Sequence, residues 1–289
     1  MARVYITDED LTSIKDKVIL ITGGSSGIGR ATVQLCLDLG AKVVIGDLKP
    51  PTPEFESNEN PKFLEVNVTE WESLRSMFTY AMEKFGRIDH VFANAGIGPT
   101  LDFLVAKLDE AGQVEPPNPR TINVNFLAVL HTLHLANAYM TKLAPENAGI
   151  GSIVLCSSCS AFETFSTGDY TIAKHGVLGM IRGFVEPLRG KVRLNAIAPS
   201  WTDTGLMPSG VFGALGVTIQ PPEAVARSVV LLFADEKRHG DVIYSWDGKF
   251  REVNNSEGGL LEFANKLLDN TGQEESAVQT LLAMGKAPA

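Results

Sequence analysis

Residues 18–29 read Val18-Ile-Leu-Ile-Thr-Gly-Gly-Ser-Ser-Gly-Ile-Gly29. An apolar and mostly β-branched run, typical of a strand buried on both faces, leads here into a turn that contains Gly23, Gly27 and Gly29. Glycine lacks a Cβ, so this backbone can turn sharply and approach a phosphate, whose charge then meets the free amides at the start of a helix. Taken alone, the pattern is equally consistent with a plain tight turn.

The same alternation continues along the chain. Short β-branched runs predict six buried strands, at residues 17–22, 42–45, 88–93, 150–156, 192–198 and 242–245. Helical patterns lie between them, as in the segment from Ile28 to Leu39, which ends at Gly40. Strands that alternate with helices predict an α/β fold, a doubly wound parallel sheet with helices on both faces.

The composition is that of an ordinary globular protein. The chain has 289 residues, of which 44% are hydrophobic and 20% charged, so we expect one domain over residues 1–289. A net charge of −9 and a pI near 5.1 would repel a phosphate backbone, and no basic stripe offsets them. Nucleic acid is therefore not an expected partner.

The chain shows no sign of export or membrane insertion. Residues 1–16 contain four acids and no continuous apolar stretch, so we do not interpret them as a signal peptide. No segment reaches the roughly 18 apolar residues of a membrane helix. Cys36, Cys156 and Cys159 are odd in number, which favours reduced thiols. We therefore expect a cytoplasmic protein with no membrane partner.

Several stretches depart from the strand and helix rhythm. Residues 50–61 and 99–119 each contain four prolines and predict surface loops. Residues 204–222 combine glycine and proline with apolar side chains, which favours a lid over a nonpolar substrate. We interpret residues 1–16 and 250–289 as terminal extensions.

Two spacings that could bind metal or carry redox chemistry are weak. His131 and His134 lie three residues apart on a predicted helix, but no third ligand stands at a useful distance, so we expect no metal. Cys156 and Cys159 have Cys-x-x-Cys spacing, which here begins inside a strand instead of at a helix start. We therefore expect no thiol chemistry.

Asp47 strengthens the interpretation of the glycine-rich turn. It ends the second predicted strand, 18 residues beyond Gly29, where an acid can accept hydrogen bonds from an adenosine ribose. The same carboxylate would repel a 2′-phosphate, and Gly24, Ser25 and Ser26 offer no cation, so we expect NAD and not NADP. The alternative is a solvated aspartate in the turn before Pro50.

Tyr170 and Lys174 form a pair on a predicted helix. Their i, i+4 spacing places a phenol and an ammonium on one face. A neighbouring ammonium favours the phenolate form of a phenol, which can then exchange a proton with a substrate hydroxyl. The spacing is common in helices, so it gains meaning only from its context.

That context is a set of signals in a fixed order. The chain carries Thr22-Gly23-x-x-x-Gly27-x-Gly29, Asn94-Ala95-Gly96, Ser158, Tyr170-x-x-x-Lys174 and Asn195-Ala-Ile-Ala-Pro199. At these intervals they resemble short-chain dehydrogenase/reductases over roughly residues 15–250. The resemblance implies one Rossmann-type dinucleotide-binding catalytic domain, and hydride transfer between a nicotinamide cofactor and an alcohol or ketone.

Two further segments refine the resemblance. The Glu115-Pro116 loop and Trp246-Asp247-Gly248 are similar to fungal enzymes of the hydroxyprostaglandin and hydroxyaverantin dehydrogenase type, which implies a place in secondary metabolism. The segments at 118–142 and 169–188 correspond to the helices that form subunit contacts in the family. The resemblance therefore implies a homodimer or homotetramer, whose interface Pro187 could bend.

The resemblance also implies a role for individual residues. Tyr170 would be the acid/base and Lys174 would support it and hold the nicotinamide ribose. Ser158 would orient the substrate oxygen, and Asn125 would hold the backbone and water of a proton relay. The cofactor would lie against Gly23, Ser25, Ser26, Gly27, Ile28, Gly29, Asp47, Asn67, Val68, Asn94, Ala95, Gly96, Tyr170, Lys174, Pro199, Thr202 and Thr204.

Some positions depart from the family pattern. Asn67 replaces the usual aspartate, although its amide can still accept a hydrogen bond. Ser200 replaces a glycine, which puts the local backbone shape in question. Phe162 either narrows the substrate pocket or packs in the core.

The position of the serine is also unusual. The interval from Ser158 to Tyr170 is one residue shorter than the commonest spacing, so Ser157 or Ser160 could supply the hydroxyl, although we favour Ser158.

These features predict an NAD-dependent oxidoreductase that interconverts a hydrophobic secondary alcohol and its ketone. Two alternatives stand beside it. One is an NADPH-dependent ketoreductase of the same fold, and the other is a non-redox biosynthetic or scaffold protein that keeps the fold. The substrate itself is not readable, because one fold and one set of catalytic residues serve many substrates.

Overall fold

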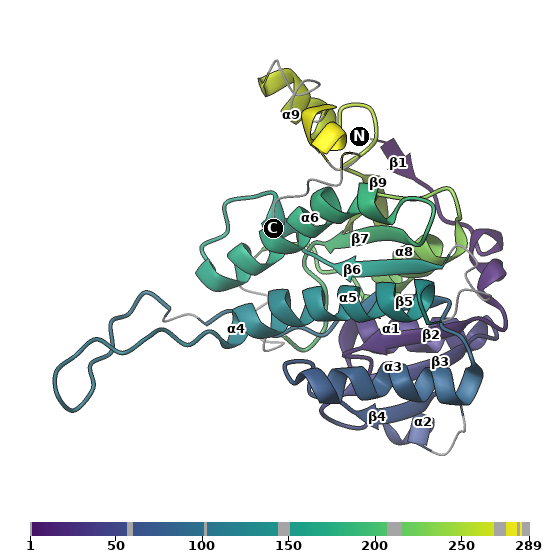
Figure 1. Ribbon diagram of the computed structural model, residues 1–289, viewed down its shortest axis with the longest axis horizontal. Coiled ribbons are helices and arrows are strands. Elements are labelled where there is room, and N and C mark those ends of the chain that lie inside the picture. Colours follow the sequence, from purple (N-terminus) through teal and green to yellow (C-terminus); the bar gives the residue numbers. More distant parts are fainter. Residues whose placement is uncertain are drawn as a thin grey trace.

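A single nine-stranded sheet forms the centre of the molecule (Figure 1). The structure, a computed structural model, describes residues 2–56, 60–100, 103–143, 151–206, 216–268, 276–281 and 284. The strands are β1 (Ala2–Val4), β2 (Val18–Thr22), β3 (Lys42–Asp47), β4 (Lys62–Glu65), β5 (His90–Ala93), β6 (Ser152–Cys156), β7 (Arg193–Pro199), β8 (Val242–Trp246) and β9 (Lys249–Glu252). Their order in the sheet is β1-β9-β8-β7-β6-β5-β2-β3-β4.

The order of the strands creates a switch point. Strands β2 to β8 pair in parallel, whereas β9 pairs antiparallel with both β8 and β1. From β2 the chain first builds outward through β3 and β4, and then returns to place β5, β6 and β7 on the other side of β2. In such sheets ligands bind outside the carboxyl ends of the strands at the reversal, here between β2 and β5.

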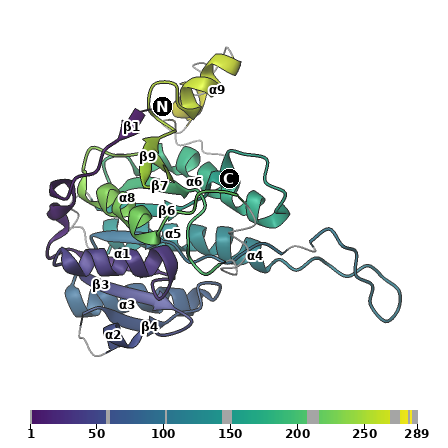
Figure 2. The same cartoon turned by 180° about the vertical axis from the view of Figure 1, so that it is seen from behind.

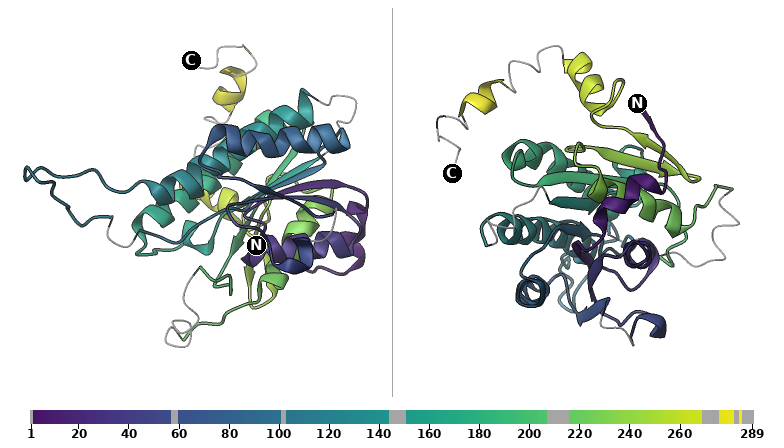
Figure 3. Two further views of the ribbon diagram at one scale, coloured as in Figure 1. Left: turned by 90° about the horizontal axis from the view of Figure 1, so that it is seen from below. Right: turned by 90° about the vertical axis from the view of Figure 1, so that its right-hand side faces the viewer.

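Helices cover both faces of the sheet. One face carries α3 (Trp71–Phe85), α5 (Ala128–Thr141) and α6 (Gly168–Leu188), and the other carries α1 (Gly27–Asp38), α8 (Pro222–Ala234) and the 3₁₀ helix η1 (Glu9–Ile14), as Figures 1 and 2 show from opposite sides. The left view of Figure 3 shows the sheet between these two layers. Phe78 of α3 and Phe233 of α8 are fully buried in the two cores, where each such side chain contributes about 1.5–3 kcal/mol.

Shorter elements connect this frame. They are α2 (Pro53–Glu56), α4 (Arg120–Ile122), a π-helical turn η2 (Asn123–Leu127), the 3₁₀ turn η4 (Cys159–Ala161) and α9 (Leu260–Leu268). Among the helices in the described part of the chain, none is long and apolar enough to span a bilayer.

The predicted fold class is confirmed, since the sheet is mostly parallel and helices flank both of its faces. All six predicted strands are present, with shifts at their ends. Ile150, the first residue of the strand predicted at 150–156, lies outside the described residues. The segment predicted as a helix at 118–142 is divided into α4, η2 and α5, and the one at 169–188 is α6.

Three strands were not predicted. The strands β1, β4 and β9 are three or four residues long and lie in the outer part of the sheet, where their exposed positions interrupt the apolar pattern. Residues 2–4 and 249–252, within or next to the segments that we interpreted as terminal extensions, therefore join the sheet through the β1–β9 and β8–β9 pairs.

The proline-rich segment after β5 forms an arm. Residues 103–119 project away from the body between β5 and α4 (Figures 1 and 3), and a single bridge joins Leu108 to Val114 within the arm. Its large aliphatic side chains are exposed, with Leu104 at 94%. The predicted surface loop at 99–119 is thus a long excursion whose root lies beside α4.

Candidate active site

The carboxyl ends of the central parallel strands open into one cavity of about 770 Å³. From β3 to β7 there are four steps between neighbouring strands, so the ends of these strands span about 19 Å. The predicted site residues in its wall are Gly23, Ser26, Gly27, Ile28, Asp47, Asn67, Val68, Asn94, Ala95, Gly96, Ser158, Tyr170, Lys174, Pro199, Thr202 and Thr204. Ser25, Gly29 and Asn125 lie behind the wall and are not part of the lining.

The glycine-rich turn is closely packed. A Cβ on Gly29 would lie 2.1 Å from the carbonyl oxygen of Gly23, and Gly23 itself has a φ of +66°. The side-chain amide of Asn94 donates to the carbonyls of Thr22 and Gly23, both at 3.0 Å, which fixes the turn against the end of β5. The tertiary packing therefore requires glycine at these positions, as expected for a backbone that approaches a ligand.

The helix that follows the turn has an uncapped start. Ser26 is the N-cap of α1, and its side chain makes no capping hydrogen bond. The first amides of the helix are therefore available to an acceptor in the cavity, where the positive end of the helix dipole favours an anion.

Asp47 is held in place at the end of β3. Its Oδ2 accepts a hydrogen bond from the amide of Ser25 at 3.0 Å, and its Oδ1 accepts one from the amide of Lys49 at 3.4 Å. Ser25 thus supports the carboxylate from behind, and its own hydroxyl donates to the Lys49 carbonyl at 2.7 Å. The carboxylate keeps free lone pairs that face the cavity.

Asn67 and Val68 lie beyond β4. The side chain of Asn67 forms its hydrogen bonds within its own loop. Its Oδ1 accepts from Thr69, and its Nδ2 donates to Glu70 at 2.7 Å. Its main role in the structure is therefore to shape the turn that leads into α3. Val68 contributes an apolar wall to the same end of the cavity.

Among the three neighbouring serines, the geometry favours Ser158. The hydroxyl of Ser157 donates to the carbonyl of Lys174 at 3.0 Å, and is thereby used to join β6 to α6. The hydroxyl of Ser160 is buried and does not line the cavity. Ser158 lines it, and its Oγ caps η4 by accepting from the Ser160 amide at 3.2 Å. Its hydroxyl donates only a long hydrogen bond to the Cys159 Sγ, at 4.0 Å, which an oxygen of a ligand in the cavity could replace.

Tyr170 and Lys174 lie on the first turns of α6. The Nζ of Lys174 is 5.5 Å from the centroid of the Tyr170 ring, and it donates to the carbonyl of Cys156 at 2.8 Å. Lys174 is 3% exposed and lines the cavity, so its charge is shielded from bulk solvent. The predicted i, i+4 arrangement is thus present, and both side chains meet Ser158 in one cavity.

Asn125 is buried inside the π-helical turn η2. Its Oδ1 accepts from the amide of Ile97 at 2.9 Å, and its Nδ2 donates to the carbonyl of the same residue at 2.8 Å. The side chain therefore holds the irregular segment that follows β5. A π turn also displaces the helical hydrogen-bond pattern by one residue, a feature frequent at functional sites.

The segment after β7 closes the cavity over the glycine-rich turn. A Cβ on Gly27 would lie 2.9 Å from the Cβ of Thr204, so Thr204 covers that turn. Thr202 pairs with Gln220 in a bridge, and its hydroxyl donates to the carbonyl of Ser200 at 2.8 Å. The bridge therefore joins the residues just before the predicted lid, 204–222, to its far end. Residues 207–215 of that lid lie outside the described residues.

The other end of the cavity contains residues that the sequence did not indicate. These are Phe165, Trp201, Arg120 and Ile97, and they lie together with Leu206 of the predicted lid. Phe162, the aromatic residue that we considered for the substrate pocket, lines a separate cavity of about 470 Å³ beside β8, β9 and α9 and packs against the core.

The remaining candidate signals have structural explanations. His131 and His134 lie around the ring of Trp71, with ring centroids at 5.6 and 6.0 Å, and no group of three or more metal-ligating side chains occurs in the described ranges. Cys156 and Cys159 are free and buried, and burial raises the pKa of both thiols. A raised pKa keeps both thiols protonated, which is their less nucleophilic form.

The chain is similar to known enzymes over most of its length. A family model described as short chain dehydrogenase matches residues 17–210. The short-chain dehydrogenase/reductase ascJ of Acremonium egyptiacum is 47% identical over 272 residues, which cover 93% of this chain and 90% of that protein. The short-chain dehydrogenase/reductase prx4 of Penicillium roqueforti is 31% identical over 235 residues, covering 80% and 69%.

Solved structures share the fold at lower identity. The ligand-free aldohexose dehydrogenase of Thermoplasma acidophilum superposes with a TM-score of 0.66 at 23% identity, over 81% of this chain and 94% of that one. Levodione reductase gives the same TM-score and identity over 80% and 96%.

Proposed function

This chain belongs to the short-chain dehydrogenase family, and we propose that it is an NAD-dependent oxidoreductase that interconverts a hydrophobic secondary alcohol and its ketone. One observation carries the proposal. Ser158, Tyr170 and Lys174 meet in the same cavity as the glycine-rich turn and Asp47. The proposed acid/base, Tyr170, would therefore lie close to a bound dinucleotide.

The residues at the ends of β2 and β3 fit a nicotinamide dinucleotide. The close packing of Gly29 against Gly23 and the uncapped start of α1 suit a pyrophosphate, and the carboxylate of Asp47 suits ribose hydroxyls. Lys174 would hold the second ribose. When bound, the nicotinamide ring supplies or accepts the hydride.

The protein's own side chains would handle the proton. During oxidation the carbinol C–H bond breaks as a hydride leaves, and the hydroxyl proton passes to the Tyr170 phenolate. Ser158 would hold the substrate oxygen through its hydroxyl, and Lys174 would keep a positive charge near the phenolate. Asn125 would fix the backbone around Ile97 and support a water relay.

The Tyr170→Phe variant tests this assignment. The ring is retained and the hydroxyl is lost, so turnover should fall by about 10²-fold or more while NAD still binds. NADH formation with a panel of secondary alcohols reports turnover, and quenching of tryptophan fluorescence reports cofactor binding. Wild-type turnover by the variant on any accepted alcohol would overturn the proposal.

A second candidate is an NADPH-dependent ketoreductase. Lys49 follows Asp47 by two residues at the same end of the cavity, and its exposed side chain is a cation that could meet a 2′-phosphate. Asp47 itself lines the cavity and opposes such a phosphate, which is why we favour NAD. Titration with both cofactors separates the candidates, since tighter binding of NADPH would favour the second.

We further propose that the enzyme acts as a homo-oligomer in the cytoplasm. The exposed apolar side chains of Leu127, Ile172 and Phe184 on η2 and α6 suit a subunit contact. Three free cysteines suit a reducing compartment.

A further inference from the structure

The cavity has an aromatic end beyond the proton-transfer residues. Phe165, from the loop before α6, and Trp201, just after β7, form a pair with ring centroids 5.6 Å apart and planes tilted by 42°. Both rings line the cavity, and Leu206 adds an aliphatic side chain. Two aromatic faces at one end of a cavity offer a large apolar contact to a flat ligand.

A cation lies in the same wall. Asp47, Arg120 and Lys174 are the charged side chains that line the cavity in the described part of the chain. Lys174 is buried and bonded to the carbonyl of Cys156, and Asp47 lies at the far end of the sheet. Arg120 is exposed, and among the hydrogen bonds and ion pairs of the described residues only its backbone takes part, as where its amide donates to Asn118, so its guanidinium has no acceptor there.

Hydrogen bonds place Arg120 near Tyr170. Arg120 is the first residue of α4. The hydroxyl of the next residue, Thr121, lies 3.2 Å from the hydroxyl of Thr100. The Thr100 amide in turn donates to Asp169, the neighbour of Tyr170 in α6. Arg120 therefore lies at the root of the arm, on the Tyr170 side of the cavity, and its exposure places it at the mouth.

We infer that the substrate is a flat apolar alcohol or ketone that carries a carboxylate or similar anionic group away from the reacting carbon. This inference rests on the proposed oxidoreductase function. The ring body lies against Phe165 and Trp201, and the anionic group pairs with the Arg120 guanidinium. Because the protein has a net charge of −9, a local cation is needed to draw an anion to this mouth.

Two matched alcohols test the anionic part. The probes are 6-(1-hydroxyethyl)-2-naphthoate and its uncharged methyl ester, which present the same ring and the same secondary alcohol. The wild-type enzyme should show about tenfold higher kcat/KM with NAD for the carboxylate, through a lower KM. Arg120→Gln should reduce that preference to about one. Since Arg120 is exposed, the preference should also fall as KCl is raised.

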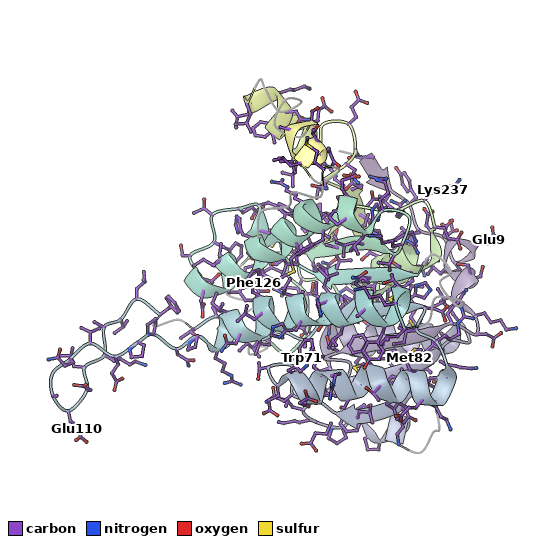
Figure 4. All side chains as sticks on the ribbon, viewed as in Figure 1. Glu9, Trp71, Met82, Glu110, Phe126 and Lys237 are labelled. Atoms are coloured by element: carbon purple, nitrogen blue, oxygen red, sulfur yellow. The ribbon has the colours of Figure 1, made fainter. Side chains whose placement is uncertain are left out.

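The matched control is Lys237→Gln. Lys237 is exposed and lies on the opposite side of the molecule from the arm, whose tip carries Glu110 (Figure 4). The variant removes the same unit of charge from the whole protein, so it should keep the preference. An equal loss in both variants would show an effect of net charge alone and would overturn the role of Arg120.

The aromatic part has its own pair of variants. Trp201→Leu should raise the KM for both naphthalene probes by about three- to tenfold. The KM for 2-octanol should rise less, because only the flat probes stack on the face of the Trp201 ring. Trp71→Leu, outside the cavity, should change neither. Equal effects of Trp201→Leu on flat and aliphatic alcohols would contradict an aromatic contact.

Failure of the inference can be told from failure of the proposed function. Turnover of the ester with no preference for the carboxylate would overturn the inference and leave the function intact. If neither probe turns over, calorimetric titration of the NAD-loaded enzyme with both probes still measures the preference and its loss in Arg120→Gln. A change of NAD affinity alone in that variant would assign Arg120 to the cofactor and overturn the inference.

Discussion

Both carboxylate oxygens of Asp169 accept a hydrogen bond from the backbone amide of Thr100, at 3.2 and 3.1 Å. Asp169 is fully buried, and its Oδ1 also accepts from the amide of Tyr170 at 2.8 Å. One carboxylate therefore joins the root of the arm to the first turn of α6. It fixes the main chain that carries Tyr170 without touching the reacting atoms.

We expect Asp169→Ala to lower both stability and activity. The partly buried Thr100 amide loses its acceptor, which costs about 1–3 kcal/mol. The Tyr170 amide keeps its hydrogen bond to the Thr167 carbonyl but loses the one to Asp169, so the Tyr170 backbone is held less firmly and kcat should fall about tenfold. Thermal unfolding and initial rates measure the two effects. Glu110→Ala, at the tip of the arm, is the control (Figure 4). A variant with unchanged kcat would show that Asp169 does not position Tyr170.

Asp47→Ser should weaken the preference for NAD. The serine keeps a short polar side chain but removes the charge that would repel a 2′-phosphate, so the ratio of the NADP to the NAD dissociation constant should fall about tenfold or more. Cofactor titrations of the purified protein measure both constants. Asp38→Asn, at the exposed end of α1, should leave the ratio unchanged. An unchanged ratio in Asp47→Ser would remove the basis for expecting NAD.

Gly29→Ala should disrupt the dinucleotide end. The added Cβ would lie 2.1 Å from the carbonyl oxygen of Gly23, so the turn must move, and both the melting temperature and NAD affinity should drop. Gly183→Ala is the matched control, because nothing lies within 4 Å of a Cβ at that exposed position of α6. There alanine should stabilise the helix by about 0.5–1 kcal/mol. Equal behaviour of the two variants would contradict the close packing of the turn.

His90 should make stability depend on pH. Burial, followed by the charges of Arg193, Lys17 and Arg87, holds the pKa of this imidazole well below its usual 6.5. The unfolded chain therefore takes up a proton below pH 6.5 while the folded chain does not, and stability falls as the pH falls, by about 1.4 kcal/mol per pH unit.

The variant His90→Phe tests this dependence. The ring contact with Phe233, now at a centroid distance of 4.9 Å, can be kept, while the titrating group is lost. Denaturant unfolding between pH 7 and pH 5 should show a shallower loss of stability than in the wild type. His175→Gln changes an exposed imidazole on α6 and should leave the slope as it is. A slope unaffected by His90→Phe would refute the assignment.

Phe184→Glu should shift the proposed oligomer towards monomer. Phe184 is 39% exposed on α6, and a charge placed in a subunit contact would be buried without a partner. Sedimentation velocity at micromolar concentration measures the shift. Tyr5→Glu, at a site that is 78% exposed near β1, is the control. A monomeric wild-type protein would count against the oligomer itself.

The sequence by itself determined the fold class and the order of the main elements. The periodicity of apolar residues indicates which face of a strand or helix is buried, and the glycines of residues 23–29 indicate a tight turn. The elements and the turn could therefore be predicted from short stretches of sequence. Short outer strands such as β4 could not, because half-exposed residues carry little pattern. The positions of Gly23, Asp47, Ser158, Tyr170 and Lys174 in one cavity follow from the parallel strand order.

The tertiary structure alone decided the rest of the site. Asn125 bonds to Ile97, 28 positions away, and Asp169 bonds to Thr100, 69 positions away. Arg120, Phe165 and Trp201 come from three separate segments of the chain, and no local pattern marks them as neighbours. The physical reason is that contacts between distant segments depend on strand order and register, whereas sequence periodicity reports only burial along each segment.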